Sequence, residues 1–256
     1  MSEKFSGMLI SIVIITRNEE AAIGRCLDSV SWADQVIVLD SGSTDQTVEI
    51  ARGKGAKVSV TKDWPGFGQQ KNRALELATG DWILSIDADE RVTPELAAEI
   101  RSMVTSPNPK AGYEMPRLSS YCGRYMRHSG WWPDYVTRLV RRGQGRFSSS
   151  LVHEHLEVDG PVGRLSHTLM HDSFHSLEQV LEKVNRYSSL SAQQMAAAGR
   201  HGGILTAISH GLGAFIKTYV LKAGFLDGRE GFMLAVSNAE GAYYKYVKLF
   251  LLNRQR

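Results

Sequence analysis

Cysteine is scarce in this sequence, and long apolar runs are missing. Its 256 residues include two cysteines, Cys26 and Cys122, which are too few for a disulfide framework or a zinc ribbon. No basic region followed by an apolar stretch is found near the start, so no signal peptide is expected. The sequence contains no run of about 18 apolar residues, so a membrane-spanning helix is not expected. These absences favour a reducing, cytoplasmic compartment.

The charge balance and two absent motifs exclude further classes of protein. A net charge of +3 is too small to indicate a nucleic-acid partner. A dinucleotide-binding domain needs G-x-G-x-x-G after its first strand, where this chain has Thr-Arg-Asn-Glu-Glu at 16–20. Five histidines fall within 153–175, but no H-E-x-x-H motif and no nearby cysteine completes a zinc site. We therefore expect neither a dehydrogenase nor a dedicated zinc centre.

Strand and helix patterns alternate along the first hundred residues. Helix starts are indicated by Asn18, by the capping box of Ser43 and Gln46, and by Thr93 followed by Pro94. The predicted order is strand 9–15, helix 19–30, strand 35–40, helix 44–52, strand 57–61, helix 69–78 and strand 82–87. The strands are continuously apolar, which predicts a mostly parallel α/β sheet with helices on both faces.

Two carboxylates stand at the end of the fourth predicted strand. Asp87 and Asp89 are separated by one residue directly after the apolar run 82–86. Residues two apart on an extended chain point the same way, and ligands bind at such strand ends in open α/β sheets. Asp40 ends a second strand in the same manner. Convergent oxygen ligands suit Mg²⁺ or Mn²⁺ shared with a substrate diphosphate, whereas the plain alternative is a polar loop.

Four segments resemble the family 2 glycosyltransferases. In the family's order and spacing they are 11–19 (SIVIITRNE), 38–45 (VLDSGSTD), 68–74 (GQQKNRA) and 85–90 (SIDADE). The resemblance implies the GT-A fold, an α/β architecture with a mostly parallel central sheet flanked by helices and, here, a helical C-terminal extension. It implies a catalytic domain at 1–175, with a nucleotide-binding half at 1–110 and an acceptor-binding half at 111–175. The extension covers 176–256.

The resemblance also implies a nucleotide pocket at the strand tips. Thr16, Asn18 and Glu19 would line this pocket at the end of the first strand. Asp40 would accept a hydrogen bond from the uracil N3–H, and Lys71 would lie near the base or the diphosphate. Simpler alternatives are a helix cap for Asn18 and a solvated helix position for Lys71.

By the same resemblance, a divalent cation, Mg²⁺ or Mn²⁺, would sit between the protein and the diphosphate. Asp89 would bind the cation directly, and Asp87 would face the ribose and the water shell of the metal. A histidine joins the metal in some enzymes of this fold, and His167 or His171 is the candidate here. Each histidine has a structural, hydrogen-bonded role as its alternative. Three arginines are expected either to contact phosphates or to form a solvated strand edge: Arg138, Arg141 and Arg142.

Sugar transfer with inversion needs one base to take the proton of the acceptor hydroxyl. The resemblance places this base in the second half, where Glu154 is the first candidate and Asp134 the second. Glu90 is a third candidate that better fits a cap or a supporting role. Of Trp131 and Trp132, we expect one to pack inside and the other to offer a ring face to an acceptor sugar.

Further segments narrow the resemblance to bacterial lipopolysaccharide-core glucosyltransferases. They are 130–134 (GWWPD), 152–156 (VHEHL) and 225–228 (FLDG). The implied reaction moves one sugar, glucose from UDP-glucose first of all, to a lipid-linked saccharide acceptor. Processive synthases are disfavoured because the chain lacks their Q-x-x-R-W motif. Two alternatives stay open. One is a polyprenyl-phosphate glycosyl or mannosyl transferase of the same fold. The other is a non-catalytic nucleotide-sugar binding module, which the acidic pair of Asp87 and Asp89 disfavours.

Two helical stretches near the end carry apolar side chains at three- and four-residue spacing. We expect the first, 204–220, to be covered by the sheet or by the other helices. The second, 232–251, has aromatic residues beside basic ones, which suits a helix lying on an anionic lipid surface. The basic residues are Lys245, Lys248, Arg254 and Arg256. The expected location is therefore the inner face of the cytoplasmic membrane, with the enzyme bound peripherally.

Overall fold

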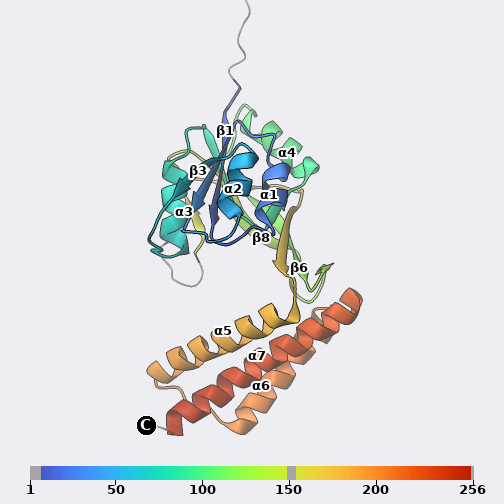
Figure 1. Ribbon diagram of the computed structural model, residues 1–256. Helices are drawn as coiled ribbons and strands as arrows, with labels where there is room; N and C mark the ends of the chain where they lie inside the picture. Colours follow the sequence, from blue (N-terminus) through green and yellow to red (C-terminus); the bar gives the residue numbers. More distant parts are fainter. Residues whose placement is uncertain (1–6, 149–153, 255–256) are drawn as a thin grey trace, which may run out of the picture. The chain divides into compact units, whose positions relative to one another are not determined.

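The computed structural model describes residues 7–148 and 154–254, which form two compact units (Figure 1). The first unit contains the described residues up to Arg117, together with Asp134–His171. The second unit contains Leu118–Pro133 and the described residues from Asp172 onward. The segment 118–133 therefore belongs with the C-terminal helices, whereas the sequence analysis assigned it to the catalytic domain.

The first unit is built on a mixed sheet. Its strands are β1 (Ile10–Thr16), β2 (Gln35–Asp40), β3 (Lys57–Val60), β4 (Trp82–Asp87), β5 (Glu90–Val92), β6 (Gly112–Tyr121), β8 (Asp134–Arg141), β11 (Val162–Arg164) and β12 (Leu169–Phe174), of which β6 and β12 continue into the second unit. The strand order is β3-β2-β1-β4-β8-β6-β12-β5. The first four strands are parallel, as the sequence pattern predicted, and β8 joins β4 in antiparallel fashion. A separate antiparallel pair is formed by β9 (Gly145–Phe147) and β10 (Leu156–Val158).

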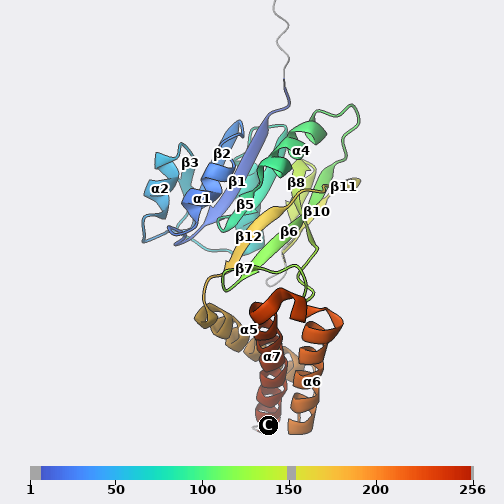
Figure 2. The same cartoon turned by 90° about the vertical axis from the view of Figure 1, so that its right-hand side faces the viewer.

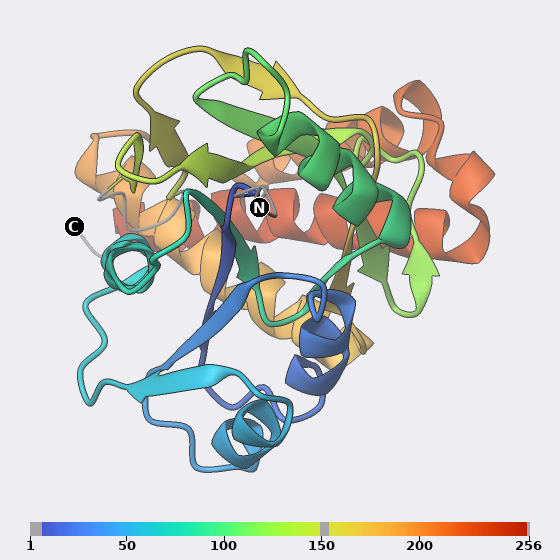
Figure 3. The same cartoon turned by 90° about the horizontal axis from the view of Figure 1, so that it is seen from above.

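Helices cover both faces of the parallel strands. They are α1 (Ile23–Ser29), α2 (Thr47–Gly53), α3 (Phe67–Glu76) and α4 (Pro94–Val104). Figure 3 shows α3, in teal, on one side of these strands and α1 and α4 on the other. Along β1, Ile12 and Ile14 join the core beneath α1 and α4, and Val13 and Ile15 join the core beneath α3. Because successive side chains point to opposite faces, this double cover explains why the whole strand is apolar.

Two predicted helix starts are wrong. α1 begins at Ile23 and α2 at Thr47, each a few residues later than the sequence pattern indicated. The side chains that were expected to cap these helices bond across the two preceding loops instead. Asn18 adopts a left-handed conformation (φ 56°), its Oδ1 accepts from the N–H of Thr44 (2.8 Å), and its own N–H donates to Ser43 Oγ (2.8 Å). These bonds tie the loop after β1 to the loop after β2.

The second unit consists mainly of helices. They are α5 (Leu177–Ala197), α6 (Ile204–Ile216), the π-helical turn η1 (Lys217–Leu221), the 3₁₀ turn η2 (Gly224–Asp227) and α7 (Gly228–Arg254), and the short strand β7 (Arg124–Tyr125) pairs with the end of β6. Figure 2 shows α7 between α5 and α6. The buried carboxylate of Asp227 accepts from the backbone N–H groups of Arg127 and His128 (3.0 Å each) and from Ser129 Oγ (3.0 Å). These bonds hold the segment 118–133 against the start of α7.

The helix α6 and the turn η1 expose large apolar side chains. Leu205 is 82% exposed and Leu221 is 73% exposed. Among the residues that the structure describes, the stretch Ile204–Leu221 is long and apolar enough to cross a membrane by length and composition, with a mean hydropathy of 1.3 and 17% of the stretch buried. The prediction that the 204–220 helix is covered is therefore wrong, whereas the expectation of no membrane-spanning helix stays a prediction, because length and composition alone do not place a helix in a membrane.

The core predicts a stability difference between two leucines. Leu84, on the central strand β4, has 0% exposure, and Leu9 is 51% exposed. Leu84→Ala should lower the free energy of unfolding by about 2–5 kcal/mol, because it removes buried methyl groups and leaves a cavity. Leu9→Ala, the matched control, should change it by less than about 0.5 kcal/mol. Urea denaturation followed by tryptophan fluorescence measures both, and equal effects would contradict the described core.

Candidate active site

The carboxyl ends of β1, β2 and β4 meet at one edge of the sheet. In the strand registers, Thr16 pairs with Asp40, and Ile15 pairs with Asp87. Thr16 Oγ1 donates a hydrogen bond to Asp40 Oδ1 (3.1 Å). The structure thus brings together the strand-end residues that the sequence analysis assigned to the nucleotide pocket.

Asp40 is already fully hydrogen-bonded within the chain. Its carboxylate, 1% exposed, accepts from the N–H groups of Gly42 (2.9 Å) and Ser43 (2.8 Å) and from the hydroxyls of Thr16 and Ser43. A carboxylate offers about four lone-pair directions, so these four bonds use its capacity. Asp40 holds the turn after β2 in this structure, and contact with a uracil ring would require one of the bonds to open.

Glu19 lies at the tip of β1 in a region of excess negative charge. Its backbone N–H donates to Thr47 Oγ1 (2.8 Å), which fixes the loop that carries it. Burial raises the pKa of Glu19 to about 7, and the carboxylates of Asp89, Asp45 and Asp87 contribute in the same direction. A cation bound here would relieve this repulsion.

Asp87 forms two ion pairs with buried cations. Its Oδ1 lies 2.9 Å from Lys71 Nζ, and its Oδ2 lies 2.6 Å from Arg138 Nη2. Lys71 also lies 3.2 Å from Glu154 Oε1, and Arg138 lies 2.7 Å from Glu90 Oε1. Each cation therefore links Asp87 to a second carboxylate.

The ion pairs continue through Glu90. Glu90 has no exposed surface; its Oε1 lies 3.3 Å from Arg117 Nη1, and its Oε2 accepts from the backbone N–H of Asp87 (2.9 Å). Arg117 in turn lies 2.7 Å from Asp134 Oδ2. We name this series the ion-pair chain; in order it contains Asp134, Arg117, Glu90, Arg138, Asp87, Lys71 and Glu154. Its two ends are the two leading candidates for the catalytic base.

Because acidic and basic side chains alternate along the ion-pair chain, its inner members Asp87 and Arg138 stay charged. Burial would raise the pKa of Asp87, but Arg138 and Lys71 outweigh burial and hold that pKa well below its usual range. Burial would likewise lower the pKa of Arg138, and the carboxylates of Asp87 and Glu90 raise it instead. Removing one partner of a buried pair leaves an uncompensated charge, which typically costs about 3–5 kcal/mol. The inner members therefore stabilise one another as a group.

Lys71 is buried because a glycine lets another segment approach its helix. Lys71 is 3% exposed, so the alternative of a solvated helix residue is wrong, and its Nζ lies 5.3 Å from the centre of the Phe147 ring. One turn earlier on α3, a Cβ atom at Gly68 would lie 2.2 Å from the carbonyl oxygen of Ser148 and 3.6 Å from Glu154 Cβ. The glycine thus allows Glu154 to reach Lys71.

Asp89 lies beside one of the two candidate histidines. The antiparallel pairing of β12 with β5 sets His171 opposite Glu90, and His171 Nε2 lies 3.3 Å from Asp89 Oδ2. His167 instead contacts Glu99 through its Nδ1 (2.9 Å). In the described part of the chain, no group of three carboxylate, imidazole or thiol side chains is arranged to hold a metal ion. His153 lies outside the described residues.

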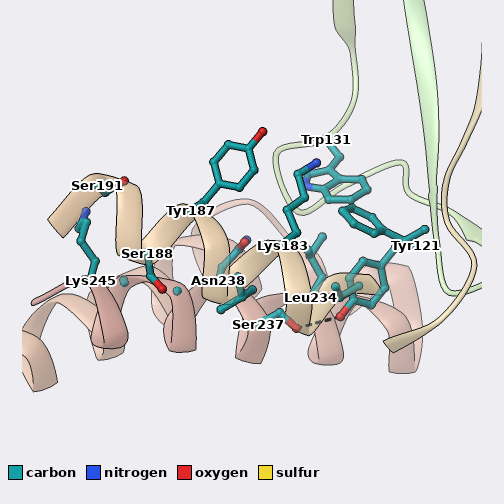
Figure 4. A pocket seen from close by; sticks show the side chains of 15 residues that line it. Tyr121, Trp131, Lys183, Tyr187, Ser188, Ser191, Leu234, Ser237, Asn238 and Lys245 are labelled. Atoms are coloured by element: carbon teal, nitrogen blue, oxygen red, sulfur yellow. Dashed lines mark hydrogen bonds between the residues drawn. The ribbon is translucent and has the colours of Figure 1, made fainter. Parts of the chain in front are cut away.

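Trp131 and Trp132, of which one was expected to pack inside and the other to meet an acceptor sugar, belong to the second unit. The Trp131 ring packs against those of Tyr121 (5.9 Å between centroids) and Phe174 (6.2 Å). Trp131 also borders a groove of about 390 Å³ between α5 and α7, which no carboxylate lines. Figure 4 shows Trp131 and Lys183 at one end of this groove and Lys245 at the other. Aromatic rings combined with two ammonium groups suit a saccharide that carries negative charge.

Sequence reasoning missed the central part of the ion-pair chain. Arg138 was expected either at phosphates or on a solvated strand edge, yet it is 6% exposed and engaged by two carboxylates. Arg117 carried no signal, because its partners Glu90 and Asp134 are distant in sequence. The supporting role considered for Glu90 agrees with its position. The available signal was an arginine within the apolar run of β8, a position that requires a buried acid as partner.

The α/β fold and the carboxylates at the strand ends define a class of protein, and comparison with known families identifies that class. Residues 11–146 match the profile of Glycosyl transferase family 2. The chain therefore belongs to this family and is a glycosyltransferase with the GT-A fold, which confirms the resemblance seen in the sequence.

Particular relatives extend over nearly the whole chain. An uncharacterised glycosyltransferase of Rickettsia prowazekii is 31% identical over 252 residues, covering 94% of this chain and 86% of the relative. The lipopolysaccharide core biosynthesis glycosyltransferase LpsC of Rhizobium meliloti is 29% identical, covering 94% of this chain and 92% of LpsC. Among solved structures, the chain is similar to glucosyl-3-phosphoglycerate synthase from Mycobacterium tuberculosis, crystallised with Mn²⁺, UDP and phosphoglyceric acid. The identity is 20%, the TM-score is 0.49, and the match covers 77% of this chain and 81% of that chain.

The raised pKa of Glu19 predicts a pH-dependent effect of substitution. Its folded-state pKa of about 7 exceeds the ordinary value of 4.5, so its contribution to stability is fully present below pH 4.5 and is lost as the pH rises through 7. Glu19→Gln stays neutral and should be more stable than the wild type at about pH 8, by roughly 1 kcal/mol after allowance for solvent screening. Near pH 4 the two proteins should unfold alike. Thermal unfolding at both pH values checks this, and a destabilised variant at the higher pH would refute it.

Proposed function

We propose that this enzyme transfers one hexose, glucose in the first instance, from a UDP-sugar to a hydroxyl group of a lipid-linked lipopolysaccharide-core saccharide, with inversion. The observation that carries the proposal is the position of Asp87, which lies at the same strand end as Asp89. Lys71 pairs with both Asp87 and Glu154 and so connects this strand end to Glu154. Membership of the family supports sugar transfer. The name of the relative LpsC supports the class of acceptor.

The nucleotide part of the donor is proposed to lie over the tips of β1 and β4. Thr16, Asn18 and Glu19 would line its pocket, and Asp87 would face the ribose. Asp40 would act mainly by holding the turn after β2, because its oxygens are engaged there. The bonds between the two loops would keep the pocket rigid before the donor arrives.

Asp89 and His171 fit a divalent cation, Mg²⁺ or Mn²⁺. A carboxylate oxygen with an imidazole nitrogen suits Mn²⁺, and Mg²⁺ is often held by one or two carboxylates together with substrate phosphates. Both oxygens of Asp87 are engaged in ion pairs, so we assign direct contact to Asp89 and a supporting position to Asp87. When bound, the cation would stabilise the negative charge of the leaving diphosphate.

Glu154 is the proposed base, with Lys71 as its positioning residue. Lys71 holds the carboxylate of Glu154 by an ion pair and joins it directly to Asp87. Asp134, the second candidate, is separated from Asp87 by three members of the ion-pair chain and has one oxygen engaged by Arg117. Glu154 would accept the proton of the acceptor hydroxyl while the diphosphate leaves.

The acceptor is proposed to be anchored in lipid, and the enzyme to work at the inner face of the cytoplasmic membrane. Within the second unit, the groove beside Trp131 offers rings and ammonium groups to the saccharide part of the acceptor. A polyprenyl-phosphate glycosyl transferase would use a lipid phosphate in place of the hydroxyl. A binding module would hold the UDP-sugar without turnover.

One assay separates these functions. A panel of nucleotide sugars is incubated with heptose-containing core acceptors or with polyprenyl phosphate, in the presence and absence of EDTA. The proposal expects transfer from UDP-glucose to the core acceptor and loss of transfer with EDTA. Transfer to polyprenyl phosphate alone, binding without turnover, or full activity in EDTA would each contradict one part of the proposal.

The proposed metal ligand predicts a loss of activity without unfolding. Asp89→Asn keeps the shape of the side chain and removes the charge that holds the cation, so kcat/KM should fall by about 10²–10³-fold. The thermal midpoint should change little, because Asp89 is partly exposed at a strand end. Asp159→Asn, on an exposed loop, is the matched control and should keep wild-type kinetics. Near-normal activity of Asp89→Asn would remove the residue from the metal site.

The proposed base predicts a selective effect on kcat. Glu154→Gln should lower kcat by about 10²–10⁴-fold, the range for losing general base catalysis, with UDP binding nearly unchanged. The matched control is Glu157→Gln on the same segment, whose side chain is 60% exposed. Steady-state kinetics and calorimetric UDP binding measure both properties. A kcat close to that of the wild type would transfer the role to Asp134.

A further inference from the structure

The large apolar side chains of α6 and η1 form one stripe on the exposed side of the second unit. We call it the apolar stripe; it contains Leu205 (82% exposed), Ile208 (52%), Leu212 (59%), Ile216 (42%) and Val220 (53%). Their spacing of three or four residues places them on a single helical face. A contiguous exposed apolar face of this kind marks an interaction surface.

The opposite face of α6 is packed against α7 through small residues. Ala207 and Gly211 of α6 are buried, and so is Thr218 of η1. A Cβ atom at Gly211 would lie 3.3 Å from both Ala239 O and Tyr243 Cβ. The helix therefore reverses the usual arrangement of a surface helix, in which large apolar residues face the core.

Aromatic and apolar residues extend the stripe through η2 to the start of α7. Phe225 is 51% exposed, Leu226 is 54% exposed and Phe232 is 48% exposed. The Tyr219 ring contacts both Phe225 (6.3 Å between centroids) and Phe232 (5.6 Å). Tyr219, whose ring carries a hydroxyl, suits the boundary between lipid headgroups and acyl chains, and the two phenylalanine rings suit its apolar side.

Basic residues outnumber acidic ones around the stripe: Asp227 of η2 is buried, and the partly exposed Glu230 at the start of α7 lies 3.9 Å from Arg124. The segment 183–226 contains no Asp or Glu. Lys217 and Lys222 are exposed beside the stripe, on η1 and directly after it. Basic residues next to an apolar helical face are the combination that binds an anionic lipid surface. A symmetric pairing of two copies through this face would instead bring lysines near lysines.

We propose that α6, η1 and η2 form a docking face that lies in the interface of an anionic bilayer. The proposal rests on the proposed function only in that the acceptor is lipid-linked. The stripe would enter the boundary with the acyl chains, while Lys217 and Lys222 contact lipid phosphates. Because α7 covers the other side of α6, the helix lies along the membrane and does not cross it.

This assignment replaces α7 as the membrane-binding helix. Lys248, one of the basic residues expected at lipid, donates from its Nζ to Asn185 O (2.9 Å), Ser188 Oγ (2.8 Å) and Ser189 Oγ (2.8 Å). Its ammonium group is therefore used between α5 and α7. Arg256 lies outside the described residues.

The test is flotation of the full chain with vesicles at low salt. One set of vesicles contains equal parts of phosphatidylglycerol and phosphatidylcholine, and the other contains phosphatidylcholine alone. The wild type should float with the anionic vesicles. Leu205→Gln/Leu212→Gln should bind them at least about ten-fold more weakly, because it removes apolar side chains from the stripe. Lys217→Gln/Lys222→Gln should reduce the preference for anionic lipid.

Matched controls separate this proposal from a defect in folding or catalysis. Leu251→Gln, on α7, replaces a leucine that is 50% exposed and should leave vesicle binding unchanged. The stripe variant should retain the wild-type thermal midpoint and the wild-type rate with a deacylated, water-soluble acceptor. If no acceptor is glycosylated but the stripe variant still loses vesicle binding, the proposed function fails and the docking face stands. The docking face is refuted if the wild type ignores anionic vesicles, if the stripe variant binds them normally, or if the stripe instead holds a dimer that the variant dissociates.

Discussion

Asp87 forms ion pairs with two buried basic side chains, Lys71 from α3 and Arg138 from β8. The arrangement of the candidate active site depends on this pairing. A buried charge without partners is costly, and each cation here is shared with a further carboxylate. Through Lys71 the pairing reaches Glu154, and through Arg138 it reaches Glu90. Glu90 in turn accepts from the backbone N–H of Asp87. The strand end that carries the D-x-D pair and the proposed base are thus held by one set of interactions.

This pairing also divides the work between the two acidic residues of the D-x-D pair. The ion pairs of Asp87 use both of its oxygens, whereas Asp89 is partly exposed and lies beside His171. We therefore propose that the first carboxylate organises the site and that the second contacts the ligand. Burial, together with the neighbouring carboxylates of Asp89, Asp45 and Asp87, raises the pKa of Glu19 at the same strand tips.

The parts of the structure that the sequence predicted are those that depend on local pattern. The apolar runs located β1, β2 and β4, and the D-x-D pair located the edge where the candidate active site lies, because strand periodicity and strand ends are local properties. Asn18 and Ser43 misled the prediction of helix starts, since residues that cap helices also bond across loops. Arg138 was misread because its partners lie about fifty residues away in the chain. Distant pairing of this kind leaves no periodic signal.

The second unit shows the complementary limit of sequence patterns. The spacing of Leu205, Ile208 and Leu212 correctly predicted one apolar helical face. It did not show whether another element covers that face, because amphipathic helices in cores and at surfaces have the same period. The answer came from the small residues Ala207 and Gly211, which pack against α7 and leave the large ones exposed.

A structure of the full chain with Mn²⁺ and UDP tests the central claim most directly, because the anomalous signal of manganese locates the cation independently of the protein. The account predicts manganese in contact with Asp89 and the diphosphate, while Asp87 keeps its ion pairs with Lys71 and Arg138 and Lys71 still holds Glu154. Manganese bound directly by Asp87, with those ion pairs broken, would contradict the account.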